Sequence, residues 1–416
     1  MNPHFGLETL LVIMLLQLKK LSAFALASSA TIASSSKSGA TGGAGAHVPV
    51  GKDGEGAYTA STKGCFDVIN TATPMILKEI ENIPLTCSDR KAFHIADYGT
   101  ADAGTSLGLL SKMVQAVRKR VDNDEQEVVL HYEDQLTNEW KSVFNHALGL
   151  KGVVDAYNNP VETPYALGNV FVEACGVGFH NECYASNSID FGLSFTAMHW
   201  LSSFPSSLKG KKYMHAARCP DDEPAILEKE QAAKDWSAIL KARARELVPG
   251  GRFACVNFCK SKEGYFLGQT DEGASMWDSF QSAWDELKAQ NLIDEEERLG
   301  VSFPNYYRSN EEFMEGLNQI PEIKVISVEE KIVRCPYREL YNSGKTGKNA
   351  REYAEWFVPT TRSWSHSTFE NALHSDRDDK EKVMAQFWEN YMSIVEKDPS
   401  SHGMDYAHAY IIFEKV

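Results

Sequence analysis

The sequence lacks the cysteine patterns that bind metal ions or build a disulfide framework. None of its eight cysteines forms a Cys-x-x-Cys pair, and none joins histidines at the spacing of a zinc site. The cysteines are typical of free thiols in a reducing compartment or of small buried side chains. We therefore predict no metal site.

Basic charge and long apolar runs are also scarce. The 416 residues carry a formal net charge of −15, whereas nucleic-acid binding requires a basic surface. Beyond the first few dozen residues, no stretch is apolar and long enough to span a membrane. The sequence thus predicts neither a nucleic-acid partner nor a membrane association of the mature chain.

A complete glycine pattern for a pyrophosphate is missing too. Residues 93–96 form a short apolar run that ends in Asp97 and opens into a turn at Gly99, and apolar residues then recur at helical spacing over residues 107–117. Ala101 stands where the second glycine of Gly-x-Gly-x-x-Gly would be, so a dinucleotide site is disfavoured. An adenosine ligand without a pyrophosphate needs less of this pattern.

What is present is a strand, a tight turn and a helix, followed by a second strand over residues 127–132 that ends at Glu133 and Asp134. Gly99 allows close approach of the backbone to a ligand. An acid after the second strand of such a unit commonly accepts hydrogen bonds from ribose hydroxyls. These residues alone leave a nucleoside site and a purely structural unit equally open.

The composition of residues 1–46 predicts a targeting presequence and linker. Residues 10–18 have the length of a signal-peptide core, and a hydroxylated segment without acidic residues follows. This arrangement resembles the two-part plastid presequence of algae with secondary plastids. We predict a plastid location, with the secretory pathway as the alternative, and a mature protein that begins near His47.

Hydrophobic periodicity divides the mature chain into three parts. Strand and helix patterns alternate over residues 47–259, which predicts an α/β fold with a doubly wound, mainly parallel, Rossmann-like sheet. Residues 260–325 interrupt this alternation and gather Trp, Phe and Tyr, as expected for a helical cap over an apolar ligand or for a satellite core. Residues 326–416 supply further strands and cap helices that complete the core.

Three local patterns have simple structural interpretations. The glycine-rich residues 51–62 favour a frayed chain start over a flap above a site. Residues 196–202, which contain His199 and Trp200, predict a strand-to-helix junction at the sheet edge where ligands bind, with a core Trp beside a surface His as the simpler alternative. The acidic residues 294–297 predict a solvated surface.

Taken together, these segments resemble the SABATH family of S-adenosylmethionine (SAM)-dependent carboxyl methyltransferases over residues 54–416. The resemblance rests on motifs in family order, among them Gly54-Glu-Gly-Ala-Tyr58, Ala96-Asp-Tyr-Gly99, Asn138-Glu-Trp140, His199-Trp-Leu-Ser202, Glu246-Leu-Val-Pro-Gly-Gly-Arg252 and Pro304-Asn-Tyr306. It implies a methyltransferase fold, SAM as cofactor, and methyl transfer to the carboxylate of a small apolar or aromatic acid.

The resemblance also implies site residues. SAM is expected at Tyr58, Thr62, Asp97, Gly99, Asp134, Gln135 and Phe179. The substrate carboxylate is expected at His199 and Trp200, to which a catalytic role is carried over. The remaining substrate contacts are expected at Cys65, Thr196, Phe258, Met276, Trp277 and Tyr306. Family members are often dimers, so a homodimer is a further expectation.

The chain departs from the plant members of the family at several of these positions. Residues 100–105 differ from the plant SAM loop, Cys65 stands in place of a Gln that grips the carboxylate, and Thr196 stands in place of a Tyr of the pocket. The identity of the acid therefore does not follow from the resemblance. The alternatives are N-methylation of a xanthine-like compound, a non-catalytic SAM-binding protein and, disfavoured by the missing glycine, a nicotinamide-dependent oxidoreductase.

Overall fold

The structure is a computed structural model that describes residues 54–84, 91–203, 205, 208, 210–211, 213–220 and 225–416. The predicted presequence and the predicted start near His47 lie outside these ranges. No helix in the described part of the chain is long and apolar enough to cross a membrane.

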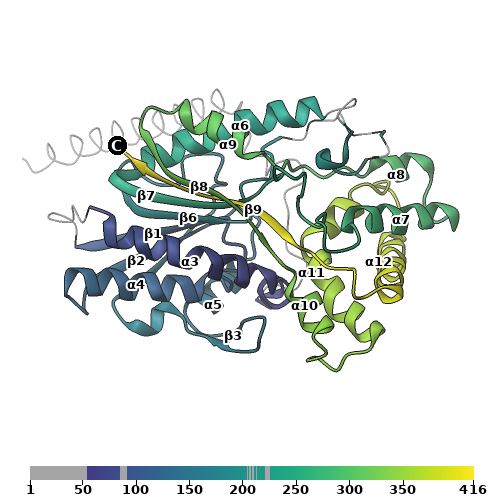
Figure 1. Ribbon diagram of the computed structural model, residues 1–416, viewed down its shortest axis with the longest axis horizontal. Coiled ribbons are helices and arrows are strands. Elements are labelled where there is room, and N and C mark those ends of the chain that lie inside the picture. The colour runs from purple at the N-terminus through teal and green to yellow at the C-terminus, as the bar shows by residue number, and fades with distance from the viewer. Residues whose placement is uncertain are drawn as a thin grey trace, which may run out of the picture. The chain divides into compact units, whose positions relative to one another are not determined.

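A seven-stranded mixed sheet forms the core of the described residues, with the strand order β5-β2-β1-β6-β7-β9-β8 (Figure 1). Strands β5, β2, β1, β6 and β7 run parallel, and β9 is antiparallel to both of its neighbours. The predicted doubly wound, mainly parallel sheet is therefore confirmed. The strands are β1 (Ala92–Tyr98), β2 (Glu127–Glu133), β5 (Val170–Cys175), β6 (Ile189–Phe195), β7 (Leu247–Phe258), β8 (Ile323–Val333) and β9 (Tyr406–Lys415), with a separate pair of β3 (Val153–Val154) and β4 (Pro160–Val161).

Helices cover both faces of this sheet (Figure 1). On one face α3 (Gly64–Asn82) packs beside α4 (Leu107–Val121), and on the other α6 (Ile226–Glu246) packs beside α9 (Asn310–Asn318). Strands β1 and β6 are buried along almost their whole length, as expected for parallel strands covered on both sides. The remaining elements of this part are α2 (Ala57–Ser61), α5 (Trp140–Ala147) and the 3-10 turns Pro164–Leu167 and Ala216–Arg218.

A second group of helices gathers beyond one end of the strands (Figure 1). It comprises α7 (Met276–Ala289), α8 (Glu295–Gly300), α10 (Pro336–Asn342), α11 (Ala350–Glu370) and α12 (Lys380–Lys397). Aromatic rings fill its interior, where Phe280 lies 4.8 Å from Tyr391 and Phe369 lies 4.3 Å from Phe387, measured between ring centroids. Rings of this size contribute most of the apolar area that holds such a layer together.

The acidic run at the start of α8 is solvated at Asp294, Glu295 and Glu296, as the sequence predicts, but not at Glu297. Asp294 and Glu297 form a reciprocal capping box at the start of α8. Glu297 is buried, pairs with Arg377 at 2.8 Å, and accepts a hydrogen bond from the backbone of His374. The Nε2 atom of His374 in turn lies 2.8 Å from a carboxylate oxygen of Asp294. The side chains here that could ligate a metal ion are therefore already paired within the protein.

The segment after β6 is not a helix, contrary to the prediction. Residues 196–202 form turns, and Thr196 has a φ of 52°, a left-handed conformation that does not start a helix. The Leu201 N–H donates to the carbonyl of Pro304 at 2.9 Å, and the Tyr306 N–H donates to that of His199 at 3.0 Å. The backbone partners come from a distant segment, which helical spacing does not reveal.

Candidate functional site

Residues 97–106, which comprise the last two residues of β1 and the turn that follows, are called the cofactor turn. Asp97 is the penultimate residue of β1, and its Oδ2 accepts hydrogen bonds from Ser106 Oγ at 2.7 Å and from Thr100 Oγ1 at 3.2 Å. Ser106 is the N-cap residue of α4 but makes no side-chain cap, because its hydroxyl is given to Asp97. Burial raises the pKa of Asp97 to about 6. The hydroxyl groups just before α4 thus hold the Asp97 carboxylate in place.

Gly99 brings this turn against two other segments. Its φ is +74°, and its N–H donates to Glu133 O at 2.9 Å. A Cβ at Gly99 would lie 2.3 Å from the Cβ of Ala197 and 3.8 Å from Cε1 of Phe179. Only glycine combines this backbone conformation with so close an approach. Gly99 therefore lies beside both the residues that follow β6 and the predicted adenine contact Phe179.

Asp134 lies directly after β2, on the same edge of the sheet as Asp97. Its Oδ2 accepts the Ala101 N–H at 2.8 Å, and its Oδ1 accepts the Gln135 N–H, also at 2.8 Å. Desolvation raises the pKa of Asp134 to about 6, and the Asp97 carboxylate adds to this shift. Paired carboxylates at the ends of adjacent parallel strands match a site that accepts hydroxyl donors from a nucleoside.

Residues 54–62 are not a frayed chain start. The Thr59 N–H donates to Asp102 Oδ2 at 2.9 Å, and the Thr59 hydroxyl donates to Asp102 Oδ1. The Gly56 N–H donates to Ser142 Oγ at 2.9 Å, and the Gly54 N–H donates to the carboxylate of Glu139 at 2.6 Å. These contacts hold the segment across the cofactor turn.

Tyr58 and Thr62 lie on this segment and face the start of α3. Thr62 Oγ1 donates to the carbonyl of Tyr58 at 2.6 Å, and the Tyr58 hydroxyl lies 3.8 Å from the Cys65 sulfur. Burial raises the pKa of the Cys65 thiol, beside which the hydroxyls of Thr62, Thr196 and Tyr406 lie. The predicted positions Tyr58, Thr62, Cys65 and Thr196 therefore come together.

The strained residue of this group is Thr196. A β-branched residue at a φ of 52° is an outlier, and its N–H is held by the carbonyl of Val256 at 2.8 Å. Backbone strain of this kind concentrates at ligand sites, where the surrounding structure maintains it. Thr196 opens the loop of residues 196–200, called the acceptor loop below.

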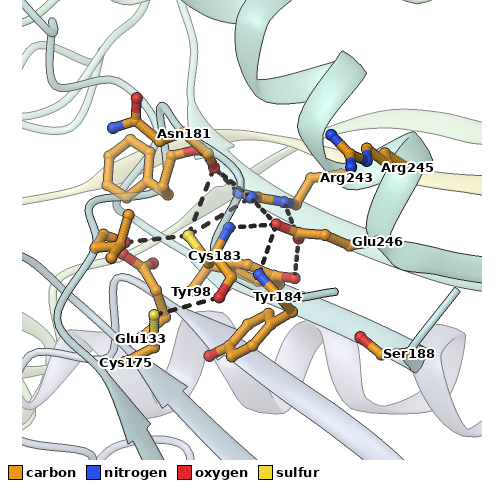
Figure 2. Close-up of polar contacts among 12 residues, drawn as sticks. Tyr98, Glu133, Cys175, Asn181, Cys183, Tyr184, Ser188, Arg243, Arg245 and Glu246 are labelled. Carbon is orange, nitrogen blue, oxygen red and sulfur yellow. Dashed lines mark hydrogen bonds and ion pairs between the residues drawn. The ribbon is translucent and has the colours of Figure 1, made fainter. Parts of the chain in front are cut away.

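A buried arginine holds the segment that carries Phe179 (Figure 2). Arg243 donates to the backbone carbonyls of Phe179 and Asn181 at 2.9 and 2.8 Å, and to the Glu246 carboxylate at 2.8 Å. Glu246 also accepts the Tyr98 hydroxyl at 2.6 Å, and the Arg243 guanidinium lies 4.1 Å above the Tyr98 ring. Sequence reasoning assigns Arg243 no site role, because its contacts are to backbone atoms more than 60 positions away.

The acceptor loop places His199 in an aromatic cluster of His199, Phe258, Tyr307 and His408. The Phe258 ring lies 4.8 Å from His199, 5.5 Å from Tyr307 and 4.3 Å from His408, between centroids. His199 is buried and also lies 5.3 Å from Trp200. Burial lowers the pKa of His199 well below its usual value, and the neighbouring His408 adds to this shift. His199 is therefore a neutral imidazole at physiological pH.

The wall residues predicted from the cap divide into two groups. Trp277 stacks on His215 at 4.5 Å, and His215 lies 4.3 Å from Tyr307, so Trp277 adjoins the aromatic cluster. Met276 is buried against Gly268, to whose carbonyl its N–H donates at 2.9 Å. Tyr306 points elsewhere, because its hydroxyl donates to Glu312 at 3.1 Å.

Sequence reasoning names Tyr306 but not Tyr307, His215, His408 or Tyr406. Residues 301–308 have no regular secondary structure beyond isolated bridges, so no periodicity tells which of two adjacent tyrosines faces inward. His408 and Tyr406 lie on the same face of β9, and both rings stack on Phe258 of β7. That pairing has no signal in the sequence.

The sheet order and the carboxylates after β1 and β2 define a Rossmann-like nucleoside-binding enzyme fold. A family model described as SAM dependent carboxyl methyltransferase matches residues 46–416. The chain belongs to this family, the SABATH methyltransferases, and is a SAM-dependent methyltransferase.

Individual relatives are distant. Gibberellic acid methyltransferase 2 of Arabidopsis thaliana is 24% identical over 274 residues, which cover 62% of this chain and 67% of the relative. Probable 7-methylxanthine methyltransferase 5 of Theobroma cacao is 24% identical over 373 residues, which cover 85% and 92%. The solved structure of loganic acid methyltransferase with SAH shares the fold, with a TM-score of 0.66, 18% identity, and coverage of 88% of this chain and 98% of that one.

The described residues fit SAM. Gly99 leaves open the space that a Cβ would fill, beside Phe179 and Ala197. Asp134 and Gln135 would hold the ribose and adenine, with Phe179 on the adenine, and Tyr58, Thr62 and Asp97 would surround the rest of the molecule. When bound, SAM supplies an electrophilic methyl group on a positively charged sulfur.

Proposed function

We propose that this methyltransferase esterifies a small carboxylic acid, giving a methyl ester and S-adenosylhomocysteine. The observation that supports this reaction is the burial of the three histidines His199, His215 and His408 beside the acceptor loop. Burial lowers the pKa of His215 and of His408 to about 3, and that of His199 falls well below its usual value. All three are neutral at physiological pH, so each carries one N–H donor, and that of His215 is already given to Asn305.

Neutral imidazoles of such low pKa favour an acceptor that is already ionised. A carboxylic acid has lost its proton at neutral pH and needs no general base. A purine N–H must lose a proton during methylation, and an imidazole whose pKa burial lowers well below its usual value, as in His199, removes protons poorly at pH 7. The environment of His199 therefore supports carboxyl methylation over N-methylation, although relatives with either kind of name exist.

The acceptor loop supplies the positioning. Ala197 touches the cofactor turn at Gly99, so His199 and Trp200 follow within three residues of the contact between the two halves of the site. His199 donates a hydrogen bond to one carboxylate oxygen, Trp200 assists it, and the other oxygen is left to attack the methyl carbon. A neutral donor orients the carboxylate without the full charge neutralisation of an imidazolium. Orientation of this kind supplies much of the rate in such displacements.

The aromatic cluster and the cap exclude water. His199, Phe258 and Tyr307 are each almost fully buried, and Trp277 reaches them through His215. On the other side, Cys65 and Thr196 lie beside Tyr58. These residues would enclose the acid between the cofactor turn and the cap helices.

The test uses the full chain, methyl-labelled SAM and a panel of aromatic, fatty and terpenoid acids, together with xanthosine and theobromine. We expect label in the organic extract that mild alkali releases, as a methyl ester requires. Label that resists alkali would replace this proposal with nitrogen or ether methylation. SAM binding without transfer to any acceptor would replace it with a binding function.

Two further proposals have no support in the described residues. A plastid location, with the secretory pathway as the alternative, depends on the composition of residues 1–46. A homodimer depends on the family resemblance. Fusion of residues 1–46 to a fluorescent protein and sedimentation of the purified chain would test each in turn.

A further inference from the structure

We propose that His408 and Tyr307 form a second polar recognition point, which hydrogen-bonds a hydroxyl or oxo group of the substrate acid at a distance from its carboxylate. This inference rests on the proposed carboxyl methylation and narrows its substrate class. It replaces the expectation of a purely apolar or aromatic acid with that of a polar-substituted one.

His408 is fully buried, and no side chain of the described residues pairs with it. It lies on β9 directly opposite Phe258 of β7, and the two rings stack at 4.3 Å with an interplanar angle of 22°. The backbone of Tyr406 acts on one ring nitrogen as a hydrogen-bond partner, but with poor geometry. A neutral imidazole presents one donor and one acceptor, so this side chain buries at least one of them without compensation.

Tyr307 brings another unpaired atom to the same ring. Its own ring lies 5.5 Å from Phe258, it is buried, and its hydroxyl has no partner among the residues that the structure describes. The unpaired groups come from β9 and from the irregular segment before α9, so they converge on Phe258 rather than follow one element.

Other buried polar groups of the described residues are of two kinds: some are fully paired, and others, such as the Tyr391 hydroxyl and the Trp284 indole N–H, are not. The Arg308 guanidinium donates to the carbonyls of Met198 and Ala232, and Arg243 is bonded at each of its nitrogens. Native proteins leave few buried polar groups without partners, and those exceptions call for an explanation. A substrate group that supplies the missing partners explains the exception around Phe258.

His199 contacts the same ring, Phe258, as the unpaired groups. His199 contacts Phe258 edge to face at 4.8 Å, whereas His408 stacks on Phe258 at 4.3 Å. The Tyr307 ring lies 5.9 Å from that of His199 between centroids, so Tyr307 and His408 border the same ring, Phe258, that His199 contacts. An acid that carries a hydroxyl or carbonyl group in addition to its carboxylate could bind both His199 and the His408–Tyr307 pair.

The experiment compares matched acids with the full-length protein. The pairs are benzoate and 4-hydroxybenzoate, phenylacetate and 4-hydroxyphenylacetate, and octanoate and 8-hydroxyoctanoate. We expect kcat/KM for the hydroxylated member of at least one pair to exceed that of its partner by about tenfold or more, since a site built around a hydroxyl rejects the analogue that lacks it.

The variants are His408→Phe and Tyr307→Phe, which keep the rings that pack on Phe258 and remove the polar atoms. Each should reduce the preference for the hydroxylated acid to within about twofold, leave the Kd for SAM unchanged and leave Tm unchanged or higher. Tyr391→Phe is the matched control, because it removes a buried hydroxyl that is unpaired within the described chain but lies in the cap core beside Phe280. It should keep the preference of the wild type.

The outcomes separate this inference from the proposed function. Esters formed without any preference for hydroxylated acids would overturn the inference and leave carboxyl methylation standing. A preference that survives in both Phe variants would also overturn it. If no acid gives an alkali-labile product, carboxyl methylation fails, and the inference fails with it.

Discussion

Gly99 and Ala197 join the two halves of the site, since a Cβ on Gly99 would lie only 2.3 Å from the Cβ of Ala197. Gly99 belongs to the turn that would hold SAM, and Ala197 belongs to the loop that carries His199 and Trp200. Because the methyl donor and the acceptor must approach within van der Waals distance, this contact sets how closely the two binding segments can approach.

The first prediction concerns Gly99→Ala. The added methyl meets Ala197, and alanine at a φ of +74° is strained by roughly 1–3 kcal/mol. We expect a lower Tm, a Kd for SAM raised by about tenfold or more, and a larger loss in kcat. Calorimetry with SAM and thermal unfolding measure the first two.

Gly152→Ala is the control for this variant. No heavy atom lies within 4 Å of a Cβ at Gly152, which is exposed. It should leave the free energy of SAM binding and the free energy of unfolding within about 0.5 kcal/mol of the wild type. Equal SAM affinity in Gly99→Ala and the wild type would show that the turn and the acceptor loop are not held in this contact.

How much of this site could be predicted from the sequence depends on the range of each interaction. Asp97 lies near the carboxyl end of β1, and Gly99 and Asp134 directly follow β1 and β2. An apolar run that ends in an acid or a glycine is a local signal. The contacts of Thr59 with Asp102 and of Gly56 with Ser142 span 43 and 86 positions, and no local pattern reports them. The glycines of residues 54–62 therefore predicted a frayed start where the structure has a fixed segment.

The choice between adjacent residues was a second limit. In a strand, alternation assigns a face, as it does for Tyr406, His408 and Tyr410 in β9. Tyr306 and Tyr307 lie in an irregular segment, so only the tertiary structure shows that Tyr307 joins Phe258 and that Tyr306 binds Glu312.

The second prediction concerns the pH dependence of SAM binding. Desolvation raises the pKa of Asp134 to about 6 in the folded protein without ligand. Ribose hydroxyls donate hydrogen bonds and prefer the ionised carboxylate, so the Kd for SAM should rise as pH falls below about 6, by up to about tenfold per pH unit. Titrations between about pH 5 and pH 8 measure it.

Asp134→Asn separates this group from Asp97, whose pKa burial also raises to about 6. The variant should bind SAM more weakly at pH 7 and show a shallower pH dependence. The pH dependence of the unliganded protein's stability has the opposite sign to that of its affinity for SAM. Between the unfolded and folded pKa values, about pH 4 to 6, the folded state binds more protons, so these two carboxyls lower the free energy of unfolding as pH rises. An unliganded protein whose stability rises across this window through these groups would contradict the assignment.

The third prediction compares two neighbouring arginines, both visible in Figure 2. Arg243→Met leaves the buried Glu246 carboxylate unpaired and frees the carbonyls of Phe179 and Asn181. Breaking a buried pair in this way costs about 3–5 kcal/mol of stability. We also expect weaker SAM binding, because the loop that carries Phe179 loses its anchor.

Arg245→Met is the matched control, since Arg245 lies two positions on and pairs with Glu182 at the surface, where its side chain is 57% exposed. An exposed pair contributes about 1 kcal/mol or less. Denaturant unfolding and SAM calorimetry on both variants give the comparison. Similar losses in the two would mean that the Arg243 network does not position the cofactor loop.

The last prediction separates binding from chemistry in the acceptor loop. The double variant His199→Ala and Trp200→Phe removes the proposed donors to the substrate carboxylate, whereas the Asp97 and Asp134 carboxylates are held by Thr100, Ser106 and the backbone of residues 101 and 135. We expect kcat/KM for the best acid to fall by about a hundredfold, the loss typical of a removed donor to an oxyanion. The Kd for SAM should stay within about twofold.

The single variants assign the loss. His199→Asn keeps a neutral donor of smaller size and should retain more activity than His199→Ala, whereas a general-base role would make both equally inactive. A flat pH profile of kcat/KM between about pH 6 and pH 8 would agree with a neutral His199 and an ionised acid. A profile that rises with a pKa in this range and disappears in His199→Asn would instead make His199 a base, and would move the acceptor from a carboxylate to a group that must lose a proton.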